Sequence, residues 1–240
     1  MLRVDLISVQ PEMLAGFFAH SIVARAIEKG LCTVSVVDLK DFGLGRWRKT
    51  DDAPYGGGPG MLMRCEPWFA AVESCRAKVP AETPTRVVMT SPAGKTFTQR
   101  DAESFARLAA EEDLHLVFMC GHYEGFDARC ETLATDFYSI GDFVMTGGEI
   151  AAAAMTDAIV RLLPGALGGG VAATASESFG AEGILETPQY THPATFRGMK
   201  VPDVLLSGDH RKIEAWRRAE AQRRTEALRP DLLAARKEAR

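Results

Sequence analysis

The sequence lacks the long apolar run and the paired cysteines that would mark a membrane or a secreted protein. No apolar stretch approaches the roughly 20 residues that cross a bilayer. The opening residues, Met1–Asp5, read as the start of a strand and not as a signal peptide. The 5 cysteines are odd in number and form no C-x-x-C pair, which argues against a disulfide framework and a zinc site. We therefore expect a cytoplasmic protein with reduced cysteines and no membrane partner.

The chain also lacks a strong net charge, but its charges are unevenly spread. The formal net charge is −4 over 240 residues. Residues 197–240 hold 12 Lys or Arg against 7 Asp or Glu, whereas residues 1–196 hold 16 against 25. The basic C-terminal end favours a nucleic-acid partner, and a solvated helix with interspersed charges is the alternative. With 46% apolar and 25% charged residues, the composition is that of an ordinary globular protein.

Apolar strands alternate with helices over the first two thirds of the chain. The pattern predicts strands at 2–8, 31–39, 85–90 and 114–120, and helices at 11–30, 66–78, 98–110 and 150–163. Pro11 and Gly30 would mark the ends of the first helix, and Thr98 begins a capping box. The alternation predicts an α/β fold, a parallel sheet with helices on both faces.

A glycine-rich stretch after Pro164 interrupts this pattern. It is small and polar, with no periodicity that could pack a face, and so predicts a linker. We place a first domain at residues 1–167, the flexible linker at 168–180 and a small, mainly helical C-terminal domain at 181–240. The last long helix begins near Asp209, with Ile213 and Trp216 as its packing residues.

Two glycine-bearing turns follow apolar strands near the middle of the chain. Gly-His-Tyr-Glu-Gly occupies 121–125, directly after the strand at 114–120. Ile-Gly-Asp-Phe-Val-Met-Thr-Gly-Gly-Glu occupies 140–149 and opens the helix that follows. Glycine at the carboxyl edge of a parallel sheet lets a ligand approach the backbone closely. We therefore expect the two turns to form one pocket.

A long polar loop at residues 46–63 is the third unusual segment. A loop of this length in a compact domain is functional or disordered. A dinucleotide fingerprint that begins at Gly56 would need glycine at position 61, which is Met61. The basic lead-in at 46–49, with Trp47 interleaved, suits phosphate contact and base stacking. A flexible hairpin-like loop is the alternative.

A phosphate-binding P-loop is the rival interpretation of the segment 94–96. Gly-Lys-Thr after a strand is the tail of that motif and would indicate a nucleotide hydrolase. The motif also needs a glycine five residues before Gly94, and that position is Met89. The pattern is therefore incomplete.

Taken together, these motifs resemble the bacterial tRNA (guanine-N1)-methyltransferase (TrmD) family. Its members carry Gly-x-Tyr-Glu-Gly and Ile-Gly-Asp-[Tyr/Phe]-Val-[Leu/Met]-[Ser/Thr]-Gly-Gly-Glu turns at this spacing. Their Asp-Asp-x-Pro-Tyr-Gly-Gly-Gly-x-Gly-Met loop is matched at 51–61, and further runs are matched at 188–193 and 201–210. The resemblance covers nearly the whole chain. It implies a SPOUT fold, in which the turns form a deep trefoil knot that binds S-adenosylmethionine in a bent shape.

The resemblance implies methyl transfer to N1 of guanosine 37, just 3′ of the anticodon, in tRNA with guanosine at positions 36 and 37. The partner is therefore tRNA and not DNA. It also implies a homodimer, with an active site that combines the knot of one subunit with the C-terminal domain of the other. Guanine N1 carries a proton, so the site needs a base and a donor to O6. Glu177 stands at the position of the family's aspartate base, and Arg161 matches the arginine near O6.

Several departures from the family pattern leave a second function open. Glu177 replaces an aspartate, His122 replaces an arginine, and Glu186 replaces another aspartate. The alternative is an RNA-binding SPOUT protein that has lost catalysis. The family's magnesium dependence implies Glu124, Glu177 and Glu186 as candidate ligands, although the sequence itself shows no metal-ligand spacing.

The remaining site residues are carried over from the family by their motifs. The implied cofactor-binding residues are Ser91, Pro92, Gly94, Gly121, Tyr123, Glu124, Ile140, Gly141, Phe143, Val144, Met145, Gly147 and Gly148. The implied substrate-binding residues are Asp52, Tyr55, Gly57, Gly58, Met61, Ser178 and Arg217.

Overall fold

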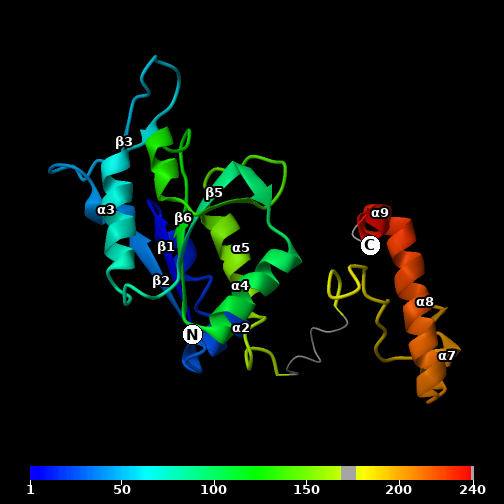
Figure 1. Ribbon diagram of the computed structural model, residues 1–240. Helices are drawn as coiled ribbons and strands as arrows, with labels where there is room; N and C mark the ends of the chain where they lie inside the picture. The colour runs from blue at the N-terminus through cyan, green and yellow to red at the C-terminus, as the bar shows by residue number, and fades with distance from the viewer. Residues whose placement is uncertain (169–176, 239–240) are drawn as a thin grey trace. The chain divides into compact units, whose positions relative to one another are not determined.

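Five parallel strands form the centre of the first of two structural units. The computed structural model describes residues 1–168 and 177–238, and the chain divides into units of residues 1–170 and 171–240. The strand order is β2 (Cys32–Asp38), β1 (Leu2–Ser8), β6 (Leu114–Met119), β5 (Thr85–Thr96) and β7 (Asp136–Ser139). Figure 1 labels the first four of these strands. Every neighbouring pair is parallel. The predicted α/β fold with a parallel sheet is confirmed.

The sequence of the central strands explains why they lie inside. All 6 residues of β6 are buried, including the polar His115. In β1 every residue except Arg3 is buried. Continuous apolar runs of this kind are typical of parallel strands that are covered on both faces. Asp5 and His115 are the polar exceptions, and their side chains hydrogen-bond to each other at 2.8 Å.

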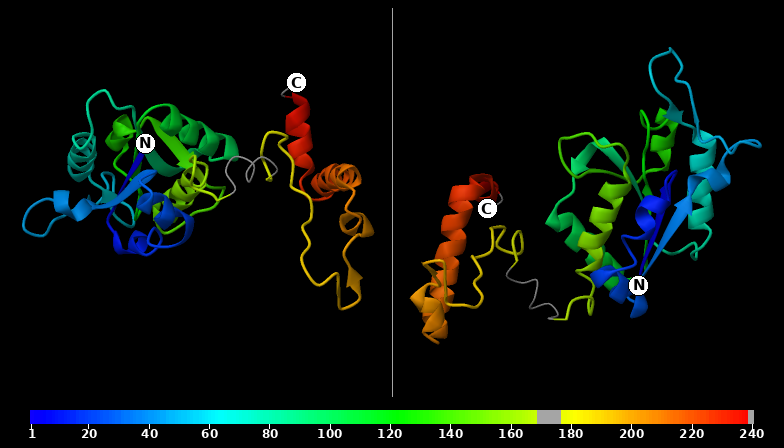
Figure 2. Two further views of the ribbon diagram at one scale, coloured as in Figure 1. Left: turned by 90° about the horizontal axis from the view of Figure 1, so that it is seen from below. Right: turned by 180° about the vertical axis from the view of Figure 1, so that it is seen from behind.

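Helices cover both faces of the sheet, as predicted. One core cluster joins the sheet to α1 (Glu12–Ala15), α2 (Ser21–Glu28), α4 (Gln99–Glu111) and α5 (Glu149–Val160). The second cluster joins the other face to α3 (Cys65–Arg76) and the 3-10 helices η1 (Leu39–Phe42) and η2 (Ala128–Leu133). In Figures 1 and 2 α3 stands on one side of the strands, and α4 and α5 stand on the other.

The continuous helix predicted at residues 11–30 is wrong. The chain forms α1, leaves the helical conformation at residues 16–20 and begins again with α2. His20 is extended, and Ser21 has a φ of 63°. Phe18, from the intervening segment, is buried in the core with an exposed fraction of 7%. Burial of this side chain outweighs the local helical preference.

Strand β5 continues past the predicted end at Thr90 to Thr96. Its pairing with β7 shifts register between Thr90 and Lys95, so residues 91–94 bulge out of the ladder. Lys95 pairs with Asp101 at 2.6 Å, next to the Thr98 capping box, which is confirmed. Residues 94–96 therefore belong to a strand and not to a loop that opens a helix. This placement rejects the P-loop alternative.

The second unit is mainly helical over its described residues. A short hairpin of β8 (Thr195–Phe196) and β9 (Met199–Lys200) precedes α7 (Asp203–Leu206), α8 (His210–Leu228) and α9 (Pro230–Glu238). Asp209 caps α8 by accepting a hydrogen bond from the backbone N–H of Lys212, which agrees with the predicted helix start. Ile213 and Trp216 are half-buried.

The predicted linker lies mostly outside the described residues, since 169–176 are not among them. Residues 177–180, which we placed in the linker, form a turn in which Phe179 N–H donates to Ile184 O at 2.9 Å. None of the described helices is long and apolar enough to cross a membrane. All five cysteines are free, and all except Cys65 are buried.

Candidate functional site

One cavity of about 390 Å³ lies where β6 and β7 end and β5 bulges. Both glycine-bearing turns line it, as expected, and the bulge after Thr90 completes the wall. Every residue predicted to bind the cofactor lies in this wall except Gly94. The members are Ser91, Pro92, Gly121, Tyr123, Glu124, Ile140, Gly141, Phe143, Val144, Met145, Gly147 and Gly148.

Backbone hydrogen bonds hold the two turns against each other. Gly148 N–H donates to Gly121 O at 2.8 Å, and His122 pairs with Gly147 as an isolated antiparallel bridge. Thr90 Oγ1 donates to Met119 O at 2.9 Å and ties β5 to β6 beneath the turns. A Cβ on Gly148 would lie 1.9 Å from this hydroxyl, so only glycine fits there. The cavity wall is thus fixed from three strands.

Gly94 has a different role from the one the family pattern implied. A Cβ at this position would lie 2.4 Å from Tyr138 N, so Gly94 allows β5 to pack against β7. The structure also adds lining residues that the sequence did not single out. They are Met89, Thr90, His122, Gly125, Phe126, Glu131, Tyr138, Ser139, Thr146 and Ala151. His122, Gly125 and Thr146 lie inside the two glycine-bearing motifs, so the motifs could have predicted them as lining residues. Glu131 comes from η2, where no motif indicates a binding site.

A buried carboxylate lies directly behind the second turn. Glu149, the first residue of α5, is only 1% exposed, and Ser8 Oγ donates to its Oε1 at 2.6 Å. Its position at the helix N-terminus stabilises negative charge. Burial, together with the charge of Glu149, raises the pKa of the Cys120 thiol well above its usual value. The basic side chain that faces Glu149 is His122, whose Nδ1 lies 3.8 Å from Oε1.

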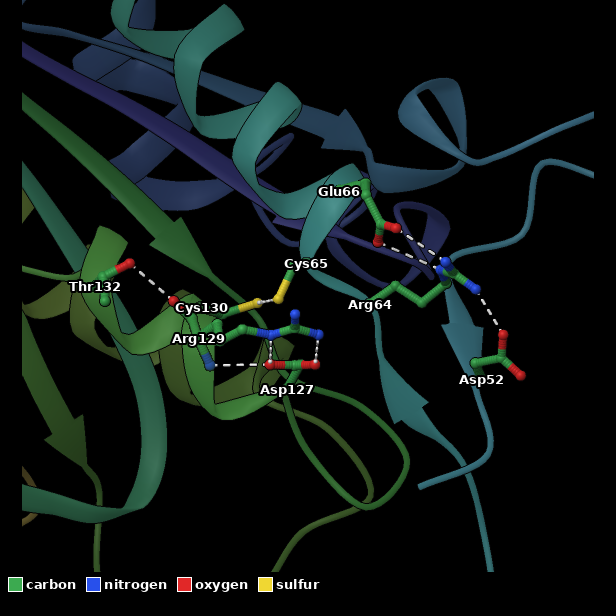
Figure 3. Close-up of polar contacts among 8 residues, drawn as sticks. All are labelled: Asp52, Arg64, Cys65, Glu66, Asp127, Arg129, Cys130 and Thr132. Atoms are coloured by element: carbon green, nitrogen blue, oxygen red, sulfur yellow. Dashed lines mark hydrogen bonds and ion pairs between the residues drawn. The ribbon is translucent and has the colours of Figure 1, made fainter. Parts of the chain in front are cut away.

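The predicted substrate loop is anchored by charged side chains at its base. β3 (Asp51–Asp52) and β4 (Leu62–Met63) pair antiparallel, and Arg64 binds Asp52 at 2.5 Å and Glu66 at 2.9 Å, as Figure 3 shows. The backbone N–H of Ala53, with the charges of Lys49 and Arg64, lowers the pKa of Asp52. Asp52 therefore stays ionised and acts first as an anchor of the loop.

The same loop is joined to the cavity by backbone contacts. Glu124 N–H donates to Met61 O at 3.1 Å, and Met63 N–H donates to Gly125 O at 2.9 Å. The structure thus brings Met61 beside the cofactor turns. Tyr55 is fully exposed, and a Cβ on Gly57 or Gly58 would meet no atom within 4 Å. These three predicted substrate residues lie on the free part of the loop.

The 3-10 helix η2 carries a second charged anchor near this loop. Arg129 binds Asp127 at 2.6 Å, and its hydrogen bonds hold the pKa of the Asp127 carboxyl well below its usual range. The thiols of Cys65 and Cys130 meet between the two anchors at 3.8 Å, where Figure 3 draws them. Burial raises the pKa of both thiols, so they pack as neutral groups.

The remaining predicted residues, apart from Arg161, lie in the second unit. A cavity of about 550 Å³ there is lined by Glu177, Glu186 and Arg217, among others. Ser178 Oγ accepts a hydrogen bond from Glu186 N–H at 3.0 Å, which fixes the turn that carries Glu177. Arg161 lies in the first unit, where its N–H donates to Asp157 O at the end of α5. The two predicted catalytic residues therefore come from different units.

The three implied magnesium ligands are divided between the two units of the chain. Within either unit, taken over residues 1–168 and 177–234, no group of three or more His, Cys, Asp or Glu side chains could hold a metal ion. Glu124 belongs to the first unit, and Glu177 and Glu186 belong to the second. Magnesium therefore enters no step of the mechanism proposed below.

Comparison with known proteins identifies the family. The model of the family described as tRNA (Guanine-1)-methyltransferase TrmD matches residues 2–235. The chain belongs to the TrmD family. A relative in Listeria monocytogenes, named tRNA (guanine-N(1)-)-methyltransferase, is 49% identical over 97% of this chain and 92% of its own length. Relatives of the same name in Lactiplantibacillus plantarum and Anaeromyxobacter are each 50% identical over 97% of this chain and 91% of their own length. Membership in the TrmD family confirms the resemblance drawn from the motifs.

Proposed function

We propose that the protein transfers a methyl group from S-adenosylmethionine to N1 of guanosine 37 in tRNA with guanosine at positions 36 and 37. The observation that carries this proposal is the convergence of two glycine-bearing turns and the β5 bulge on one cavity in a TrmD family chain. The curated relatives carry the name of this activity. We assign cofactor binding to residues 1–167 and tRNA binding to residues 181–240.

The cavity in the first unit has the properties that S-adenosylmethionine needs. It combines backbone turns with apolar side chains, and Tyr123, Phe143 and Val144 leave exposed apolar surface in its wall. A Cβ on Gly125 would meet no atom within 4 Å, so a ligand can approach the backbone there. Such a mixture of apolar wall and few polar groups is typical of cofactor sites. When bound, the cofactor supplies an electrophilic methyl carbon on a positively charged sulfur.

Two side chains would serve the guanine. Glu177 is a carboxylate and takes the proton from N1, which makes that nitrogen a nucleophile. Arg161 donates to O6 and stabilises the negative charge that develops there. Methyl transfer then requires the two reactants in line and no covalent intermediate on the protein. Ser178 supports this role because its hydroxyl holds the turn that contains Glu177.

We propose further that the cofactor turns form a deep trefoil knot and that the protein acts as a homodimer. Arg161 and Glu177 come from different units of the chain. A shared site, with the knot of one subunit and the C-terminal domain of the other, would supply both residues. Full activity at a dilution where ultracentrifugation shows only monomers would contradict the shared site.

The loop at 46–63 and α8 supply the groups that tRNA binding requires. Trp47 is 76% exposed, and the guanidinium of Arg46 lies 4.4 Å from its ring centroid. An exposed ring beside cationic groups suits base stacking and phosphate contact. In the second unit, Arg217 faces its cavity from α8.

The direct test is a methylation assay with isotope-labelled S-adenosylmethionine and unmodified leucine or proline tRNA. After digestion to nucleosides, the label should appear in 1-methylguanosine. The matched control is the same transcript with adenosine in place of guanosine 37, which should stay unlabelled. Label in another nucleoside, or bound cofactor without transfer, would contradict the proposal. Binding of tRNA without any binding of S-adenosylmethionine would favour the non-catalytic alternative.

A further inference from the structure

A negatively charged group lies immediately behind the cofactor cavity without lining it. Ala151, on the same helix as Glu149, and the preceding Gly147 and Gly148 all line the cavity. A Cβ placed on Gly147 would lie 2.2 Å from Glu149 Oε2. The carboxylate is thus separated from the cavity by a turn that carries no side chain at this point.

The second oxygen of this carboxylate has no partner. Ser8 satisfies Oε1, but Oε2 is buried without a hydrogen bond. His122 Nδ1 is also buried without a partner, and 3.8 Å from Oε1 is too far for a hydrogen bond. Among the side chains of residues 1–168 and 177–234, no Lys or Arg forms an ion pair with Glu149. Apart from the N-terminus of α5 and the nearby imidazole of His122, this carboxylate therefore has no cationic partner among the described side chains.

An uncompensated buried charge is costly unless a ligand of opposite sign offsets it. Its effect reaches several ångströms because the surroundings screen it weakly. The side chains of Ser8, Cys120 and His122 lie near the Glu149 carboxylate. None of them carries a permanent positive charge. The cavity wall next to Glu149 therefore favours a cation over a neutral ligand of the same shape.

We propose that Glu149 makes the cofactor cavity selective for positive charge, so that it binds a sulfonium in preference to the corresponding thioether. Glu149 acts here as a specificity-determining and positioning residue, because Gly147 and Gly148 lie between it and the ligand. This inference rests on the proposed function, which supplies a positively charged donor and a neutral product. The donor loses its positive charge when the methyl group is transferred. The cavity would then bind the neutral product more weakly, which assists product release.

The test is a comparison of dissociation constants by calorimetry at a single pH, without tRNA. S-adenosylmethionine and sinefungin carry a positive group at the reacting centre, and S-adenosylhomocysteine does not. Removal of the charge in Glu149→Gln keeps size and shape. It should weaken binding of the two charged ligands about tenfold, or about 1.4 kcal/mol, and change binding of S-adenosylhomocysteine by less than about twofold.

Two control variants separate charge from structure. Glu149→Asp keeps the charge and should restore most of the preference for the charged ligands. Ser8→Ala removes the hydrogen bond but leaves the carboxylate, so any loss should be equal for all three ligands. An equal loss for all three ligands in Glu149→Gln, or no change in any, would overturn the inference while leaving the proposed function intact. Failure of the unmodified protein to bind S-adenosylmethionine would instead overturn the proposed function.

Discussion

The two units of the chain differ in how firmly their own residues fix their functional groups. In the first unit, two clusters of buried apolar side chains pack against the two faces of the sheet, and the two glycine-bearing turns follow directly after strands β6 and β7. Among residues 177–234 of the second unit, Ala221 and Thr225 are the only buried residues. A small unit with so little core gains little stability from burial. We infer that the cavity of the first unit is preformed, whereas fewer internal contacts fix the groups of the second unit.

The largest effect is expected at Glu177, the residue of the second unit that we propose as the general base. Glu177→Gln removes the proton acceptor but keeps the size of the side chain. Loss of a general base lowers rates by about 10²–10⁴, which single-turnover methylation of tRNA would measure. Binding of S-adenosylmethionine should stay unchanged, because we propose that the cavity of the first unit binds the cofactor.

Glu177→Asp is the matched control, since it restores the residue that the family carries while shortening the side chain. Partial or full activity would show that the turn accepts both lengths. A single-turnover rate for Glu177→Gln that equals the unmodified rate across pH would assign the proton to another acceptor. Glu186, which lines the same cavity, would be the first to test.

The second-largest effect is expected on the stability of the first unit, when its buried ion pair at Asp5 is removed. Asp5 is 1% exposed and bonds to His115 at 2.8 Å and to Lys78 at 3.0 Å. Asp5→Ala leaves both partners without their acceptor and should lower the free energy of unfolding by about 3 kcal/mol. Urea unfolding would measure this. A loss below about 0.5 kcal/mol, the level of a surface substitution, would show that the pair contributes little.

The Asp5 carboxyl should also make the stability of the protein depend on pH. Burial alone raises the pKa of Asp5, but the hydrogen bonds from His115 and Lys78 outweigh it, so the pKa lies below the ordinary value. A carboxyl with a lowered pKa stabilises the fold above the unfolded-state pKa, and this contribution is lost as pH falls through the folded-state pKa. The unfolding free energy should therefore decrease below about pH 4, and less steeply in Asp5→Ala.

The sequence predicted the scaffold of the first unit better than its details. Apolar runs and glycine positions located β1 and β6 and brought the two cofactor turns to one cavity. Periodicity could not show that Phe18 would leave the first helix to enter the core, because that choice depends on distant residues. It also could not separate Gly94, which packs against β7, from the glycines that line the cavity. In the second unit, the short elements around residues 195–206 carry too little periodicity to be predicted.

An intermediate effect is expected at a glycine of the preformed cavity. In Gly147→Ala the new Cβ would lie 2.2 Å from Glu149 Oε2 and 2.6 Å from His122 Nδ1, so the turn must shift. Affinity for S-adenosylmethionine should fall about tenfold, or about 1.4 kcal/mol, as calorimetry would show. Gly16→Ala is the control, since its Cβ would meet no atom within 4 Å, and it should bind normally. Equal affinities in the two variants would mean that the turn is not preformed.

The smallest effect is expected when one of the internal hydrogen bonds of the second unit is removed. Thr225 Oγ1 accepts a hydrogen bond from Leu185 N–H at 3.0 Å and donates to Ala221 O at 2.7 Å. Thr225→Val keeps the shape but leaves Leu185 N–H without this partner. The second unit should lose about 1 kcal/mol of stability, seen as faster amide exchange in α8. Unchanged exchange there would show that other contacts fix the segment around Leu185.

The most direct test of the difference between the units is amide hydrogen exchange of the full-length protein with and without S-adenosylmethionine. A preformed site in the first unit predicts slower exchange at residues 90–92, 121–126 and 140–148, the segments that line the cavity. Exchange in α8 should change little until tRNA is added. Unchanged exchange in these three segments at saturating S-adenosylmethionine, with protection in α8 instead, would contradict the account.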